Sequence, residues 1–255
     1  MQQYDSFFEY ERVLGREVVA AFLGAQRLSI DGKRVLDIGC GEGGILAGLA
    51  ERYRFHGFGL DYDEEMVRRA KAIPNCTIAH GDVYSYTFSG TYDFILIRDV
   101  LEHCGDPEAL LHKAATLLSL KGCIYATYTP FVSPFGGHQH NGSGFFSNVP
   151  YIQMLPEAVF LKLICPIGNL YKQGAGLLKD FRQIRKTWLT TGQVTQAAGK
   201  AGLAVAVARG WFVRPDHRYK FGLMPVPFPP GFPVHSLTDL ACTSIEVLLR
   251  RFDDA

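Results

Sequence analysis

Hydrophobic and polar positions along the chain follow two kinds of pattern, one typical of helices and one typical of strands. Apolar residues first recur at helical spacing, which predicts an amphipathic helix over residues 5–28. Short apolar runs then alternate with helical patterns. The predicted strands are 34–38, 55–60, 77–79, 92–97 and 123–127, and the predicted helices between them are 45–52, 64–72 and 107–118. This alternation predicts right-handed βαβ units and a parallel sheet with helices on both faces.

The pattern changes after residue 130. From there to about residue 190 the chain is rich in glycine, proline and aromatic residues. We therefore predict one domain formed by residues 1–130 and 191–255, with residues 131–190 inserted as a lid over the carboxyl edge of the sheet, where substrates of such folds bind. A proline cluster at 225–230 is expected to block any regular element there. The remaining predicted elements are helices near 156–164, 176–187 and 193–201, and strands over 203–213 and 243–249.

Composition and charge exclude several classes of protein. A net charge of +1 gives no reason to expect nucleic acid or an anionic membrane as a partner. The six cysteines have no C-x-x-C spacing, which favours reduced thiols over a disulfide framework or a structural zinc site. The chain starts without the features of a signal peptide, and no apolar run is long enough to cross a bilayer. These observations predict a cytoplasmic protein without stable membrane insertion.

A glycine-rich turn directly follows the first predicted strand. The strand ends in Asp37, and Gly39, Gly41 and Gly44 then match the G-x-G-x-x-G pattern, with Gly43 as a further glycine. Glycine lets bare backbone approach a ligand, so a strand, such a turn and a helix together are typical of a nucleotide site. The glycines alone leave more than one class of cofactor open.

Acidic residues also end the next two predicted strands. Asp61 lies twenty residues after Gly41, where a carboxylate can accept hydrogen bonds from both ribose hydroxyls of an adenosine cofactor. Asp82 follows Gly81 at the end of the third strand and would suit the adenine amino group. Each acid has a simpler interpretation, as a solvated residue at a strand end or as part of a common turn pair. The series therefore carries more weight than any single member.

With these residues in order, the segment from Tyr92 to His103, followed by Asp106 and Pro107, resembles the class I S-adenosylmethionine-dependent methyltransferases. The sequence is most similar to the ubiquinone- and menaquinone-biosynthesis (type 11) group. The resemblance covers residues 33–130 well and 193–213 and 242–251 thinly. It implies a Rossmann-like, doubly wound sheet of seven strands with the last strand antiparallel, and S-adenosylmethionine as the cofactor.

An acid at position 37 also argues against a nicotinamide or flavin enzyme. Dehydrogenases usually carry an apolar residue there, whereas S-adenosylmethionine brings an ammonium group that a carboxylate can bind with charge assistance. The resemblance implies that Tyr62 or Met66 flanks the adenosine, that Val83 lies beside the adenine, and that the backbone of Arg98 passes near the methionine end. Ordinary packing is the alternative for each. The predicted cofactor-binding residues are Asp37, Gly39, Gly41, Gly43, Asp61, Tyr62, Met66, Asp82, Val83 and Arg98.

A second group of polar residues is expected beside the transferred methyl group. Its members are Asp99, Glu102, His103, His138 and His140, which follow two neighbouring strands. Asp99, Glu102 and His103 would share one face if their segment were helical. We favour a metal-free site in which His103 or His138 acts as a general base, since imidazole titrates near neutrality. The alternative is a divalent cation held by these acids and imidazoles, because small-RNA 2′-O-methyltransferases look similar here.

The inserted segment indicates the kind of acceptor. Its many aromatic residues favour a small, apolar or aromatic molecule of the quinone, lipid or natural-product type. The sequence therefore predicts methyl transfer from S-adenosylmethionine to an oxygen, carbon or nitrogen of such a molecule, with no nucleic-acid partner. Two alternatives remain at this point: a metal-assisted O-methyltransferase acting on RNA ends or a diol, and a non-catalytic cofactor-binding module.

Overall fold

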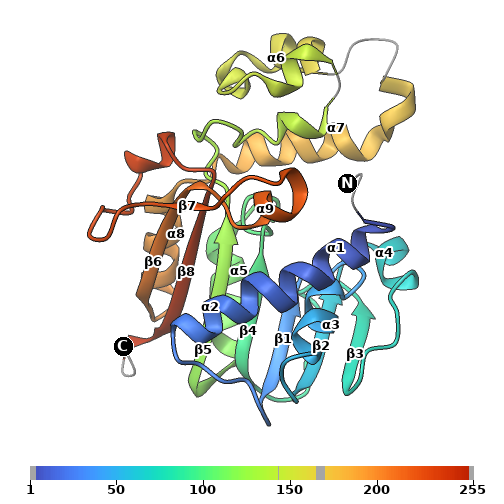
Figure 1. Cartoon of the computed structure of the whole chain (residues 1–255), viewed down its shortest axis with the longest axis vertical. Helices are drawn as coiled ribbons and strands as arrows, with labels where there is room; N and C mark the ends of the chain where they lie inside the picture. The colour runs from blue at the N-terminus through green and yellow to red at the C-terminus, as the bar shows by residue number, and fades with distance from the viewer. Residues whose placement is uncertain (1–3, 143, 165–169, 253–255) are drawn as a thin grey trace.

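A central sheet with helices on both faces forms the body of the protein, and a helical layer lies above one edge of that sheet (Figure 1). The computed structural model describes residues 4–142, 144–164 and 170–252, with backbone alone for 170–177. The strands are β1 Arg34–Ile38, β2 His56–Asp61, β3 Cys76–His80, β4 Tyr92–Arg98, β5 Leu118–Tyr128, β6 Leu203–Val213, β7 Val226–Pro227 and β8 Ser244–Arg251. Their order in the sheet is β3-β2-β1-β4-β5-β8-β6-β7.

The first five strands run parallel, as the predicted βαβ units require. Strand β8 is antiparallel to both β5 and β6, which agrees with the antiparallel last strand that the resemblance implied. The sheet has eight strands where seven were predicted, because β7 adds a two-residue strand to the edge at β6. The expectation that the proline cluster blocks any regular element was therefore wrong. An edge strand tolerates proline because one of its sides needs no hydrogen-bond donor.

Two apolar cores lie on opposite faces of the sheet, and the strands supply both by alternation. Val35 and Phe94 face one core, whereas Leu36 and Ile95 face the other. The first core is covered by the N-terminal helical segment and α3 Gly44–Ala50, and the second by α5 Pro107–Leu117 and α8 Thr191–Lys200. Burial on both faces explains why the central strands are almost continuously apolar.

The predicted N-terminal helix is one continuous helical segment with a wider turn in its middle. It comprises α1 Phe7–Leu14, a π-helical turn η1 Gly15–Val19, and α2 Ala20–Ala25. Ser6 begins it by accepting a hydrogen bond from the backbone N–H of Glu9. The segment packs very closely on α3: a Cβ atom added to Gly48 would lie 2.0 Å from the carbonyl oxygen of Arg12. Glycine on α3 therefore sets the distance between the two helices.

The segment 131–190 forms its own small layer above the carboxyl ends of the strands (Figure 1). It comprises the short 3-10 helices η2 Gln139–Asn141, η3 Phe145–Asn148 and η4 Ile152–Met154, and the helices α6 Glu157–Ile164 and α7 Leu170–Thr187. Its core consists of Ile152, Phe160, Ile164 and Phe181. The layer therefore has an apolar core distinct from the two beside the sheet, while its role as a substrate lid stays a prediction.

Other differences from the predicted elements are local. Helix α4 Glu64–Arg68 ends before residue 72, and helix α9 Asp216–Phe221 has no counterpart in the prediction. The segment after β4 makes a turn closed by a hydrogen bond from His103 N–H to the carbonyl of Val100, so it is not helical there. Cys165 lies outside the described residues, and the other five cysteines are free thiols. Within the described ranges, no helix combines the length and apolarity that a membrane crossing needs.

Candidate active site

The glycine-rich turn joins β1 to α3 and leaves bare backbone at the carboxyl edge of the sheet. Gly39, Gly41 and Gly43 all have positive φ angles, of 76°, 54° and 84°, which L side chains rarely adopt. A Cβ atom on Gly39 would also lie 2.5 Å from Cγ2 of Val100. The glycines at these positions are therefore required by the fold of the turn. That these residues bind a cofactor stays a prediction.

Asp37 is the next-to-last residue of β1, just before this turn. Its side chain is buried, and its Oδ2 atom has no hydrogen-bond partner among the described residues. Burial raises the pKa of Asp37 to about 7, with Arg98 lowering it and Asp61 raising it. A buried carboxyl group without a partner is costly, and the ammonium group of S-adenosylmethionine would supply one. The unpaired carboxyl group of Asp37 therefore fits the predicted cofactor at this position.

The other predicted cofactor residues lie along the same sheet edge, at different depths. Asp61 is buried and accepts hydrogen bonds from the N–H groups of Gly41 (2.7 Å) and Asp63 (2.8 Å). An ionised carboxylate offers about four lone-pair sites, so acceptor capacity remains for ribose hydroxyls. Asp82 is exposed and accepts from the N–H of Tyr84. The others are Tyr62, which is 76% exposed, and Met66 and Val83, which are half-buried.

The side chain of Arg98 belongs to a buried network of charges rather than to the glycine turn. Its Nη2 atom donates to Asp216 of α9 at 2.6 Å. Arg214 donates to the same carboxylate at 2.8 Å and to Asp99 at 2.6 Å. Burial raises the pKa of Asp99, but the guanidinium groups of Arg214 and Arg98 together outweigh burial and hold that pKa below its usual range. Asp99 thus accepts hydrogen bonds from Arg214 and from the hydroxyl of Thr127. It bonds neither histidine directly, although its charge acts on the pKa of both.

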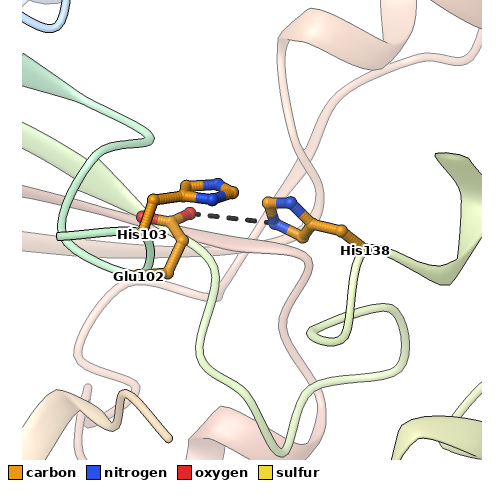
Figure 2. A group of neighbouring side chains, drawn as sticks. All are labelled: Glu102, His103 and His138. Carbon is orange, nitrogen blue, oxygen red and sulfur yellow. Dashed lines mark ion pairs between the residues drawn. The ribbon is translucent and has the colours of Figure 1, made fainter. Parts of the chain in front are cut away.

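Glu102, His103 and His138 point toward one another at the carboxyl ends of β4 and β5 (Figure 2). The distance from Oε1 of Glu102 to Nε2 of His138 is 3.9 Å, and the ring centroids of the two histidines are 4.9 Å apart. His140 stands 5.7 Å beyond His138, measured between ring centroids. Four of the residues expected to cluster therefore lie close together, although their two segments are about 35 positions apart in the sequence: Glu102, His103, His138 and His140.

His103 has a partner that the sequence analysis missed. Its Nδ1 atom lies 2.5 Å from Oδ1 of Asp180 on α7, a helix of the inserted segment. Burial lowers the pKa of His103, but the hydrogen bond to Asp180, together with the negative charges of Glu102, Asp180 and Asp99, outweighs burial and raises it. In the described part of the chain the carboxylate that faces His138 is that of Glu102, at 3.9 Å, beyond hydrogen-bond distance, and burial holds the pKa of His138 well below the usual value. The two imidazoles therefore differ: His138 is neutral, while His103 can carry a proton.

Glu102 is buried beside them. Its Oε1 atom accepts a hydrogen bond from the N–H of Thr129, and its Oε2 atom has no partner within the described part of the chain. Burial and the charge of Asp99 raise the pKa of Glu102. Asp180 and Glu11, which lies over the glycine turn, escaped the sequence analysis because each sits among other charged residues in a helix that reads as solvated surface.

Three features define the S-adenosylmethionine-dependent methyltransferases of Rossmann-like fold: the glycine turn after β1, the buried acids Asp37 within β1 and Asp61 at the end of β2, and an antiparallel strand beside β5. The chain belongs to the methyltransferase domain family, whose model matches residues 8–142. S-adenosylmethionine is the cofactor of this class, and two structures of similar fold hold its product S-adenosylhomocysteine.

Solved structures of similar fold cover nearly the whole chain. A methyltransferase from Mesorhizobium loti matches 91% of this chain and 96% of its own, with a TM-score of 0.58 at 16% identity. Magnesium protoporphyrin IX methyltransferase from Synechocystis PCC 6803 matches 97% of this chain and 89% of its own, with a TM-score of 0.52 at 18% identity. At such identities the likeness establishes the fold alone.

Curated relatives match over a shorter length. A ubiquinone biosynthesis O-methyltransferase from Erwinia tasmaniensis is 35% identical over 101 residues, which are 37% of this chain and 41% of the relative. The (S)-tetrahydroprotoberberine N-methyltransferase of Eschscholzia californica is 30% identical over 106 residues, 38% of this chain and 30% of the relative. The chain thus covers less than half the length of these relatives.

Proposed function

We propose that the protein transfers the methyl group of S-adenosylmethionine to an oxygen, carbon or nitrogen of a small apolar or aromatic molecule. The observation that carries this proposal is the pair formed by His103 and Asp180, beside Glu102 and His138. A histidine oriented by a carboxylate is the arrangement of a general base. It favours an acceptor that loses a proton during transfer, such as a hydroxyl group.

The chemistry divides between the cofactor and the protein. S-adenosylmethionine supplies a methyl group that is already activated by its sulfonium. The chain's own residues would bind and orient the two reactants and remove the proton. In this mechanism His103 accepts the acceptor's proton, and Asp180 stabilises the imidazolium that results. His138, held neutral by burial, would accept or donate a hydrogen bond to the acceptor.

Aromatic side chains of the inserted segment support an apolar acceptor. Phe131 is buried against Trp188, with ring centroids 4.2 Å apart, whereas Phe145 and Phe146 are exposed. The relatives' names, which refer to ubiquinone biosynthesis and to an N-methylated tetrahydroprotoberberine, agree with aromatic acceptors. We propose that residues 131–190 act as the lid over this acceptor, and that the protein works in the cytoplasm without a nucleic-acid partner.

The experiment is a methyl-transfer assay with radiolabelled cofactor on a panel of phenols, quinols and aromatic amines. His103→Ala should lower turnover by about a hundredfold or more while cofactor affinity stays within about twofold, since general-base catalysis is lost. Asp180→Asn should lower turnover without changing cofactor affinity. The exposed His112, on α5, provides the control: His112→Ala should leave turnover unchanged. Full activity in the His103→Ala variant would refute the proposed base.

One observation favours a second candidate, metal-assisted O-methyl transfer. Ligand atoms of Glu102, His103 and His138 all lie within 4.8 Å of one another, and Oε2 of Glu102 is buried without a partner in the described residues. Ligands of one divalent ion stand roughly 3–3.5 Å apart at bond lengths of about 2.1 Å, so the group would have to contract. Dialysis against EDTA distinguishes the candidates, because only a metal-assisted enzyme loses activity and regains it with Mn²⁺, Mg²⁺ or Zn²⁺.

A further inference from the structure

Four carboxyl groups lie in or beside the glycine turn: Glu11 of α1, Asp37 of β1, Glu42 of the turn itself and Asp61 of β2. Asp61 accepts two backbone hydrogen bonds, and Glu42 is paired with Nε of Arg69 at 2.8 Å. The other two are different: Oε2 of Glu11 and Oδ2 of Asp37 are buried and accept no hydrogen bond from the residues described. Buried polar atoms normally have partners. Two unpaired acids at one point therefore indicate a place that receives positive charge.

Helix α1 positions Glu11 directly against the bare backbone of the turn. A Cβ atom on Gly41 would lie 3.6 Å from Oε2 of Glu11, and one on Gly44 would lie 2.5 Å from the Cβ of Glu11. A side chain at Gly44 would thus displace Glu11. The missing side chains of the turn give this carboxyl group its place beside the predicted path of the cofactor.

Among the described residues, the surrounding charges leave Glu11 without a counter-ion. Burial, together with the charges of nearby carboxyl groups and against the lowering effect of Arg98, raises the pKa of Glu11 to about 8; those carboxyl groups are Asp37, Glu42 and Asp61. Arg98 cannot serve as a full partner, since its guanidinium donates to Asp216. At neutral pH the carboxyl of Glu11 is therefore mostly protonated, and a cation that enters the turn would favour its ionised form.

We propose that Glu11 selects the cofactor by its charge, pairing with the positively charged methionine end of S-adenosylmethionine and holding S-adenosylhomocysteine less tightly. The inference rests on the proposed cofactor site. S-adenosylmethionine carries a sulfonium, an ammonium and a carboxylate, for a net charge of +1, whereas the demethylated product has a net charge of zero. A buried carboxylate therefore gains more from the cofactor than from the product. Glu11 loses its proton to solvent as the cofactor binds and regains it as the product leaves.

Calorimetry on the whole protein tests this proposal with three ligands: S-adenosylmethionine, S-adenosylhomocysteine and sinefungin, a stable analogue with an amine in place of the sulfonium. Glu11→Gln should weaken binding of the two cationic ligands by at least about tenfold, because a charge-assisted contact is lost. Binding of S-adenosylhomocysteine should weaken by less than about threefold. Glu11→Asp, which keeps the charge, should restore part of the preference for the cationic ligands.

Glu9→Gln is the matched control, since Glu9 lies on the same helix but pairs with Arg12 and Lys71 away from the turn. It should change all three affinities by less than about twofold. A second readout is the number of protons released when sinefungin binds at pH 7, measured in two buffers of different ionisation enthalpy. The wild-type protein should release more protons than Glu11→Gln.

Two results would overturn the inference, and they are distinguishable. Glu11→Gln could weaken the three ligands equally, or leave them unchanged, while the wild-type protein binds all three. Glu11 would then have no part in charge selection, and the cofactor site would stand. A wild-type protein that binds none of the three ligands would instead refute the proposed cofactor site itself, and the inference with it.

Discussion

Helices α1 and α3 are in such close contact that one methyl group added to α3, at Gly48, should destabilise the protein instead of stabilising it. In a helix, replacing glycine by alanine normally stabilises by up to about 1 kcal/mol. At Gly48 the added Cβ would lie 2.0 Å from the carbonyl oxygen of Arg12 and 2.7 Å from the backbone nitrogen of Arg16. Both atoms belong to backbone and cannot turn aside, so the helices must separate. Overpacking of this kind costs typically 1–3 kcal/mol. Here we expect the upper half of that range, which exceeds the gain in helix propensity by about 1–2 kcal/mol.

Gly24 provides the matched control, because a Cβ atom there meets nothing within 4 Å. Gly24→Ala should raise the free energy of unfolding by up to about 1 kcal/mol, and Gly48→Ala should lower it by about 1–2 kcal/mol. For a chain of this size each kcal/mol moves Tm by about 2–4 °C, so the variants should differ by roughly 5–10 °C in a thermal melt. Equal upward shifts in both variants would show that α1 and α3 are not in such close contact.

Four further predictions follow from residues already described. Asp61→Ala should weaken S-adenosylhomocysteine binding at least about tenfold in calorimetry, through loss of hydrogen bonds to ribose, while NADH should bind to neither form; tight NADH binding would contradict the cofactor assignment. Residues 131–190 should exchange amide hydrogens faster than residues 33–127 in the absence of ligand, and uniform protection would make them a fixed part of the core. Asp216→Ala leaves Arg98 and Arg214 without their shared carboxylate and should cost about 3–5 kcal/mol in urea unfolding; a loss below about 1 kcal/mol would mean that this network is solvated. Because burial raises the pKa of Glu11 to about 8, the folded state still holds a proton that the unfolded state has released above about pH 4.5. The contribution of Glu11 to stability therefore falls as pH rises from about 4.5 to 8. The free energy of unfolding of Glu11→Gln should rise relative to that of the wild-type protein over that range, and parallel stability curves would contradict the raised pKa.

Much of the sheet was predictable because each central strand carries its own signal. The strand from Val35 to Ile38 is mostly apolar, contains Asp37 near its end and is followed directly by the glycine turn. The position and direction of this strand, and the sheet edge at which a ligand is expected, therefore follow from neighbouring residues. Strand β6 likewise begins and ends where the pattern predicted. Features that depend on contacts along a short stretch of chain can be worked out from that stretch alone.

The partners of the site residues could not be predicted in this way. Asp180 reaches His103 across 77 positions only because the inserted segment folds back over the sheet. Arg214 takes up Asp99 from 115 positions away, after a strand whose neighbours the sequence does not specify. Helix α9 was missed for a related reason: its six residues carry little periodicity, and its place depends on the buried charges of Asp216.

Because of the π-helical turn η1, the number of residues in the N-terminal segment determines the direction in which its side chains point. One residue of an α-helix corresponds to about 100° of rotation, and a π-helical turn shifts the phase between the parts before and after it. Here α2 turns Phe22 into the core beside the sheet, while α1 turns Glu11 onto the glycine turn. Deleting one residue from η1 would hardly change the reach of the segment, yet it would rotate Glu11 by about a quarter of a turn. An insertion or deletion in this segment is therefore compatible with the site only if the rotation it causes leaves the side chain of Glu11 facing the glycine turn.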